Sequence, residues 1–171
     1  MSEFLTIGLS KKVIFDKIGL FTSYLAGKRS DDYAAFDRVA TFDTDIPVLD
    51  YASDDAAAFL AAELGEMVND FKIEGDVIRY IMRNPLPEGS PNTDLLFRLT
   101  ESYIVAETII RWLRIVGYEF GEGARQALTS AAEVAATKLK LLRRALTAPS
   151  EAPAESGPRI MKARSRRLPP I

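Results

Sequence analysis

Five aspartates lie close together in the sequence and are the first side chains that could bind a metal ion. They are Asp43, Asp45, Asp50, Asp54 and Asp55. Carboxylate oxygens suit calcium, but a calcium-binding loop also needs a glycine at its turn and a glutamate at its end. This spacing provides neither of them. Because acidic residues stabilise the N-terminal end of a helix, we interpret the cluster as a helix start and predict no bound metal or cofactor.

Two residue types that carry much of enzyme chemistry do not occur in the chain. Its 171 residues include no cysteine and no histidine. Disulfides, thiolate nucleophiles and cysteine-ligated zinc are therefore excluded, as are the usual general base at neutral pH and the commonest metal ligand. The glycines of residues 117–123 lack the preceding strand and the Lys-Ser/Thr pair of a phosphate-binding loop. Together these features predict a protein that is not an enzyme.

Residues 159–171 combine positive charge with apolar side chains. The cations are Arg159, Lys162, Arg164, Arg166 and Arg167, and the apolar residues between and after them are Ile160, Met161, Leu168 and Ile171. Such a segment can contact phosphates or an acidic protein surface. The apolar residues favour a protein surface, because phosphate contacts need no apolar anchors. We therefore predict an arm that interacts with protein; contact with nucleic acid and a solvated tail remain as alternatives.

Charge is distributed unevenly along the chain. From Lys138 to the end there are nine basic and two acidic residues, which gives +7; the net charge is −2, so residues 1–137 carry −9. An acidic body with a basic end favours self-assembly, with the end of one copy on the body of another, or contact with nucleic acid. The isoelectric point near 5.3 is low for a dedicated nucleic-acid-binding protein.

Apolar residues recur at helical spacing over four stretches, which predict helices at about 10–26, 45–71, 93–117 and 122–147. Residues 72–83 alternate around a glycine and predict a short β-hairpin. We therefore expect a mainly α fold in which residues 1–147 form a four-helix, bundle-like domain. Residues 148–171 form a Pro/Ala-rich linker and the extended basic arm. No apolar run is long enough to span a membrane, and residues 1–4 do not resemble a secretory signal, so we expect synthesis in the cytoplasm, which the resemblance described below makes a bacterial one.

Three aromatic residues are candidate anchors of the core or of a subunit interface. They are Phe59, Tyr103 and Trp112, each on a predicted helix. The helix at 93–117 has apolar residues on more than one side, which predicts a central position. Glu107 and Arg111 stand four residues apart on this helix and predict a surface ion pair.

Three parts of the chain resemble the head–tail connector (adaptor) proteins of tailed bacteriophages and prophages. They are the acidic entry to an alanine-rich helix at 43–60, the block Thr-Glu-Ser-Tyr-Ile-Val-Ala-Glu-Thr-Ile-Ile-Arg-Trp-Leu-Arg-Ile-Val-Gly at 100–117, and the closing helix that runs to Arg144. The chain is similar in particular to short proteins of Bacteroidetes prophage structural clusters. The helix at 10–26 and residues 148–171 depart from the compact adaptor pattern as additions to it.

The resemblance implies a ring of identical copies under the portal, at the virion neck, with portal and tail proteins as further partners. It implies no catalytic or ligand-binding residue. The alternative is a small helical regulatory module that binds a protein or nucleic acid through its basic C-terminus. The dependence of binding on salt concentration distinguishes these interpretations. Contacts with phosphate weaken steeply as the salt concentration rises, whereas binding through apolar anchors persists.

Overall fold

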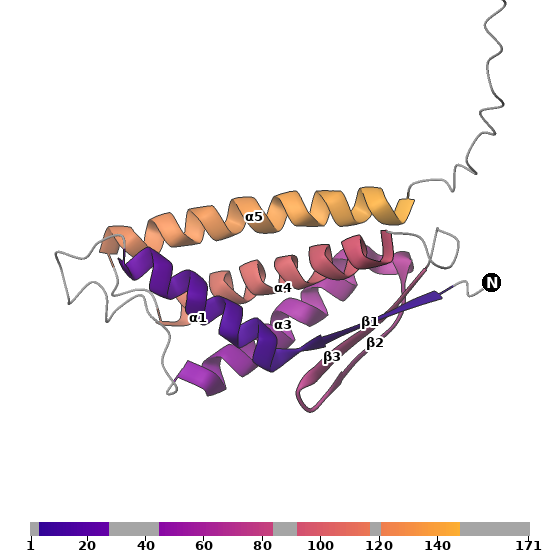
Figure 1. Ribbon diagram of the computed structural model, residues 1–171, viewed down its shortest axis with the longest axis horizontal. Coiled ribbons are helices and arrows are strands. Elements are labelled where there is room, and N and C mark those ends of the chain that lie inside the picture. The colour runs from indigo at the N-terminus through magenta and orange to yellow at the C-terminus, as the bar shows by residue number, and fades with distance from the viewer. Residues whose placement is uncertain (1–3, 28–44, 84–91, 117–120, 148–171) are drawn as a thin grey trace, which may run out of the picture.

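The computed structural model describes residues 4–27, 45–83, 92–116 and 121–147, which form four α-helices, a 3-10 turn and one three-stranded sheet (Figure 1). The elements follow one another as β1 (Phe4–Ser10), α1 (Lys11–Gly27), α3 (Ile46–Leu64), η2 (Gly65–Met67), β2 (Val68–Glu74), β3 (Val77–Arg83), α4 (Asn92–Val116) and α5 (Gly121–Thr147). The predicted mainly α class is confirmed. The predicted arm, residues 159–171, lies outside the described residues.

The sheet is antiparallel, in the order β1-β3-β2. Side chains alternate between its two faces, as expected for strands. Ile7 of β1 lies opposite Tyr80 of β3, and both are buried. On the other side of β3, Phe71 of β2 lies opposite Tyr80, with their ring centroids 5.1 Å apart. Tyr80 is thus the centre of the buried face, and its hydroxyl donates a 2.9 Å hydrogen bond to the carbonyl of Ala57 on α3.

The predicted short hairpin at 72–83 is present as β2 and β3, but it belongs to a larger sheet. β2 begins at Val68, within the stretch predicted to be helix, and β1 adds a third strand. The hairpin turn places Gly75 at its first central position with φ +58°, an arrangement typical of a type II′ turn.

The helix predicted at 45–71 is also shorter than expected. α3 ends at Leu64, where Gly65 adopts φ +52° and donates its N–H to the carbonyl of Ala61. Residues other than glycine avoid this backbone region, so Gly65 is the physical reason for the stop. Met67 and Phe71, which continue the apolar helical spacing in the sequence, lie in η2 and β2 instead.

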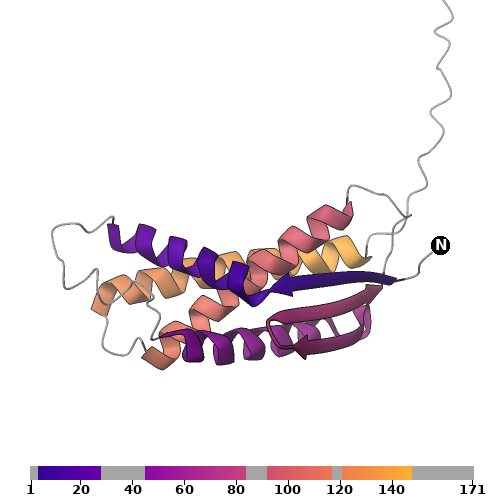
Figure 2. The ribbon, with the colours of Figure 1, turned by 60° about the horizontal axis from the view of Figure 1, so that its bottom comes forward.

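The helices pack in layers around α4 (Figures 1 and 2). α5 lies along one side of α4, whereas α3, α1 and β1 contact it from the other directions. The predicted central position of this helix is confirmed. The buried face of α5 consists of small and aliphatic residues at helical spacing: Ala124, Ala127, Ala131, Ala135, Leu142 and Leu146. Alanines at these positions let the two backbones approach closely.

Two of the three predicted anchors lie in the core, and the third does not. Trp112 is 1 % exposed and Tyr103 is 2 % exposed, and both belong to the main apolar cluster. Phe59 is 42 % exposed on α3 and lies outside that cluster. The buried threonines Thr100 and Thr108 donate to carbonyls one turn earlier in α4, so their hydroxyls are satisfied inside the helix. Within the described residues, no helix combines the length and the apolarity needed to cross a membrane.

Candidate functional site

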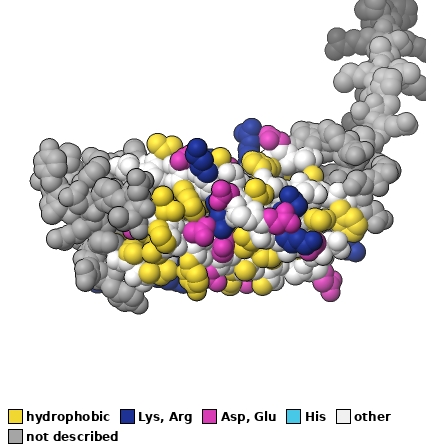
Figure 3. All heavy atoms as spheres, turned by 90° about the horizontal axis from the view of Figure 1, so that it is seen from below, with side chains coloured by type: hydrophobic (Ala, Val, Ile, Leu, Met, Phe, Trp, Pro, Cys, Tyr) yellow, Lys and Arg dark blue, Asp and Glu magenta, His cyan; other side chains and the backbone are white. Residues whose placement is uncertain are grey.

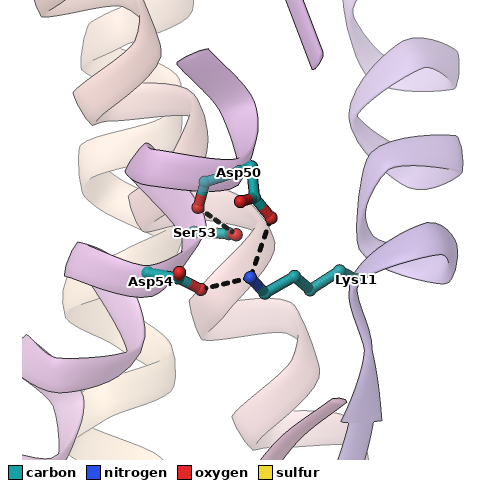
Figure 4. A network of polar contacts seen from close by, with 4 residues as sticks. All are labelled: Lys11, Asp50, Ser53 and Asp54. Atoms are coloured by element: carbon teal, nitrogen blue, oxygen red, sulfur yellow. Dashed lines mark hydrogen bonds and ion pairs between the residues drawn. The ribbon is translucent and has the colours of Figure 1, made fainter. Parts of the chain in front are cut away.

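Lys11 is the most buried charged side chain for which the structure gives ion pairs. It begins α1 directly after β1, and its side chain is only 5 % exposed. Its Nζ lies 2.8 Å from Oδ1 of Asp50 and 2.6 Å from Oδ1 of Asp54, both on α3 (Figure 4). Its backbone N–H donates to the carbonyl of Asp76 in the hairpin turn. One residue therefore joins α1, α3 and the sheet.

The charge state of Lys11 follows from this environment. Burial lowers the pKa of the ammonium, but hydrogen bonds and charge from Asp50 and Asp54 outweigh that effect and raise the pKa above 10.5. A lysine that acts as a base or nucleophile needs the opposite shift. Lys11 therefore remains a cation at neutral pH and acts as a structural clamp.

Arg111 forms a second junction, between α4 and α3. Its guanidinium pairs with Asp55 on α3 and, at 3.1 Å, with Glu107 one turn earlier on α4. It also lies over the ring of Phe59, with 5.1 Å between the guanidinium carbon and the ring centroid. The ion pair of Glu107 with Arg111 is confirmed, but the prediction that it lies on the surface was wrong, since the two side chains are 12 % and 18 % exposed.

Two further ion pairs connect helices that are distant in sequence. Lys17 of α1 pairs with the buried Glu101 of α4. Arg143 of α5 lies 2.6 Å from a carboxylate oxygen of Glu63 on α3 and donates to the backbone carbonyl of the same residue. Each of the four described helices is thus joined to another by at least one ion pair.

The predicted acidic cluster has a different role from the one expected. Asp45 stands at the start of α3, as the interpretation of a helix start requires. Asp50, Asp54 and Asp55 lie beyond the first helical turn and instead neutralise Lys11 and Arg111. Asp43 lies outside the described residues. In the part of the chain that the structure describes, no three acidic side chains converge as a metal site would require.

Burial raises the pKa of both core tyrosines. The pKa of Tyr80 rises because of its burial and, to a smaller extent, because of Tyr103. The pKa of Tyr103 rises because of its burial, then because of the negative charges of Glu107 and Glu63. Both phenols therefore stay protonated at neutral pH.

These shifts predict alkaline unfolding. Tyr80 is neutral in the folded chain at pH values where an unfolded tyrosine, with a pKa of 10.0, has already lost its proton. Its stabilising contribution is complete below about pH 10 and is lost as the pH rises further, at about 1.4 kcal/mol per pH unit. The raised pKa of Lys11 acts in the same direction. Urea unfolding at about pH 8 and about pH 11 should show this loss, and Tyr80→Phe should reduce the slope; an unchanged slope in that variant would contradict the assignment to Tyr80.

Two open hollows lie on the described surface. The first, the α1–α3 hollow, has a volume of about 860 Å³. Its apolar lining is Phe15, Leu20, Ile46 and Leu49, and its charged lining is Lys11, Lys12, Asp16 and Asp76. The second, the α4–α5 groove, has a volume of about 900 Å³ and is lined by Phe59 of α3, by Ile110, Arg111 and Arg114 of α4, and by Ala132 and Glu133 of α5, among others. The two hollows share no lining residue.

The residues that build these junctions were only partly recognised in the sequence. The aspartates were identified, but Lys11 and Arg111 were not recognised as their partners. Lys11 and Asp50 are 39 residues apart, and Arg111 and Asp55 are 56 residues apart. No local sequence pattern connects residues at such separations.

Comparison of the chain with protein-family models, with curated proteins and with solved structures finds no match in any of the three. The resemblance to connector proteins therefore stays a prediction.

Proposed function

We propose that the chain is a structural component of a phage or phage-like particle, a head–tail connector that forms a ring of identical copies. The observation that supports assembly best is the exposure of large apolar side chains on all four described helices. Leu20 of α1 is 73 % exposed and Tyr51 of α3 is 66 % exposed; the others include Ile46, Phe59, Ile115 and Leu141. The position within a particle follows from the resemblance in the sequence alone.

The exposed apolar residues lie beside charged groups instead of forming one uniform surface. On the face shown in Figure 3, patches of apolar side chains alternate with clusters of acidic and basic ones. Exposed apolar patches bordered by polar residues are typical of protein interfaces. A face of this kind can bury its apolar side chains against a partner while its charges select the partner and the register.

A closed ring requires contacts between unlike surfaces, because a patch on one copy must meet a different patch on the next. The α1–α3 hollow and the α4–α5 groove are two such unlike surfaces, built from separate residues. The ion pairs between helices support the same proposal, since they hold the helices of one copy in a fixed arrangement that can be repeated around a ring.

Solution mass tests the proposal. We expect light scattering on the full chain to give an oligomer or a mass that rises with concentration. A chain that ends at Thr147 should assemble more weakly, because it lacks the arm. Measurement at about 50 and about 200 mM salt separates an apolar-anchored arm, which persists, from phosphate-type contacts, which weaken steeply. A salt-independent monomer for both chains would contradict self-assembly and favour the regulatory module.

A further inference from the structure

We propose that the α1–α3 hollow is the receptor for the C-terminal arm, residues 159–171, of a neighbouring copy. This inference rests on the proposed self-assembly and specifies the surface that it uses. The hollow offers the two features that the arm requires, which are exposed apolar side chains and an excess of negative charge.

The apolar part of the hollow is unusually open. Leu20 is 73 % exposed and Ile46 is 46 % exposed, although both line the same concave surface. A concave surface of this size can accept the aliphatic side chains of an extended segment. The arm carries such side chains at Ile160, Met161 and Leu168.

The accessible charge of the hollow is negative. Lys11 is buried, and its charge is neutralised by Asp50 and Asp54. Exposed Lys12 is opposed by the exposed carboxylates of Asp16 and Asp76. Asp50 and Asp54 together carry one negative charge more than Lys11, so the charged residues in and beside the hollow sum to −2. The five cations of the arm complement this surface.

Charge also distinguishes the hollow from the α4–α5 groove. In the groove, Arg111 and Glu107 are largely buried and pair with each other. Asp55 also pairs with Arg111 and is 48 % exposed, and the exposed charges of Arg114 and Glu133 cancel, so the groove and its partners carry −1. The α1–α3 hollow with its partners carries −2, so it attracts a basic arm more strongly.

The arm is long enough to reach another copy. Residues 148–158 separate Thr147, the last residue of α5, from the arm, and these 11 residues span up to about 40 Å when extended. This equals the length of the 27-residue helix α5, which is about 40 Å. The start of α3, which borders the hollow, lies away from the C-terminal end of α5 (Figure 1).

Cross-linking between full-length chains tests the docking. The chain has no cysteine, so a single introduced thiol is unique. A Leu20→Cys chain and a Met161→Cys chain are mixed and treated with a short bis-maleimide, and covalent dimers are measured. Val134→Cys, at an exposed position on α5 that lines neither hollow, replaces Leu20→Cys in the control. We expect several-fold more dimer with Leu20→Cys; equal yields would overturn the proposal.

Charge variants give a second measurement. The double variant Asp16→Asn, Asp76→Asn should lower the yield of the Leu20→Cys cross-link about threefold. The control is the double variant Glu66→Gln, Glu133→Gln, which removes the same charge outside the hollow and should leave that yield unchanged. If residues 28–44 of the same chain fill the hollow, the Leu20→Cys thiol will resist a mono-maleimide even in a chain that ends at Thr147 and lacks the arm, which would also overturn the proposal. If light scattering finds oligomers but this cross-link does not form, only the proposal that the hollow is the receptor is refuted. If light scattering finds monomers under all conditions, both proposals are refuted.

Discussion

Replacing Asp50 and Asp54 together by asparagine should lower the free energy of unfolding by about 3 kcal/mol. The Nζ of Lys11 is enclosed, and these two carboxylates are the charges that neutralise it. Without them a buried ammonium either remains unpaired or loses its proton, and both outcomes reduce stability. Urea unfolding followed by far-ultraviolet circular dichroism measures the loss.

The Lys11→Met variant is the matched control. It leaves Asp50 and Asp54, whose side chains are 50 % and 36 % exposed, but the Oδ1 of Asp54 is buried and loses its partner, so the expected loss is about 1–2 kcal/mol. Adding Lys11→Met to the double asparagine variant should recover part of its stability, because the buried charge is then gone. Strictly additive losses would show that the three side chains do not act as a unit.

Replacing Trp112 by alanine should cost about 3–5 kcal/mol of the free energy of unfolding. Trp112 is among the largest fully buried side chains of the described core, and its removal leaves a cavity beside the last turns of α4. Because the chain has one tryptophan, the variant loses its fluorescence signal, and circular dichroism must follow unfolding instead.

The Trp112→Phe variant separates packing from hydrogen bonding. The indole nitrogen is buried and has no hydrogen-bond partner among the described residues. Phenylalanine therefore forfeits only part of the apolar contact, and we expect a loss of about 1–2 kcal/mol. A loss as large as that of the alanine variant would reveal a polar role for the indole.

Local pattern in the sequence predicts the long helices well. The expected helix at 93–117 corresponds to α4 (Asn92–Val116), and the one at 122–147 corresponds to α5 (Gly121–Thr147). Both have sustained helical spacing and clear boundaries. Pro47 lies in the first turn of α3, where the missing backbone N–H costs no helical hydrogen bond.

The errors arise where one local signal competes with another or where the partner is distant. The apolar spacing of α3 continues past Leu64, and only Gly65 marks its end. Apolar residues alternate in β1 at Leu5, Ile7 and Leu9, and this period of two is typical of a strand. The strand was missed because β3, with which β1 pairs, is more than 60 residues away in the sequence. The clamps of Lys11 and Arg111 depend on tertiary contacts in the same way.

The packing of α5 on α4 has a consequence for the order of events during synthesis. β1 is made first, but it cannot pair until β3 has been made, since Phe4 lies opposite Arg83. α5 contacts mainly α4, so the surface it needs is complete before it leaves the ribosome. The sheet can therefore pair while α5 is still in the exit tunnel, but the core closes only when α5 docks, because the buried face of this helix belongs to the main apolar cluster. Residues 159–171 follow α5 in the chain, so they emerge after the helix that completes the core.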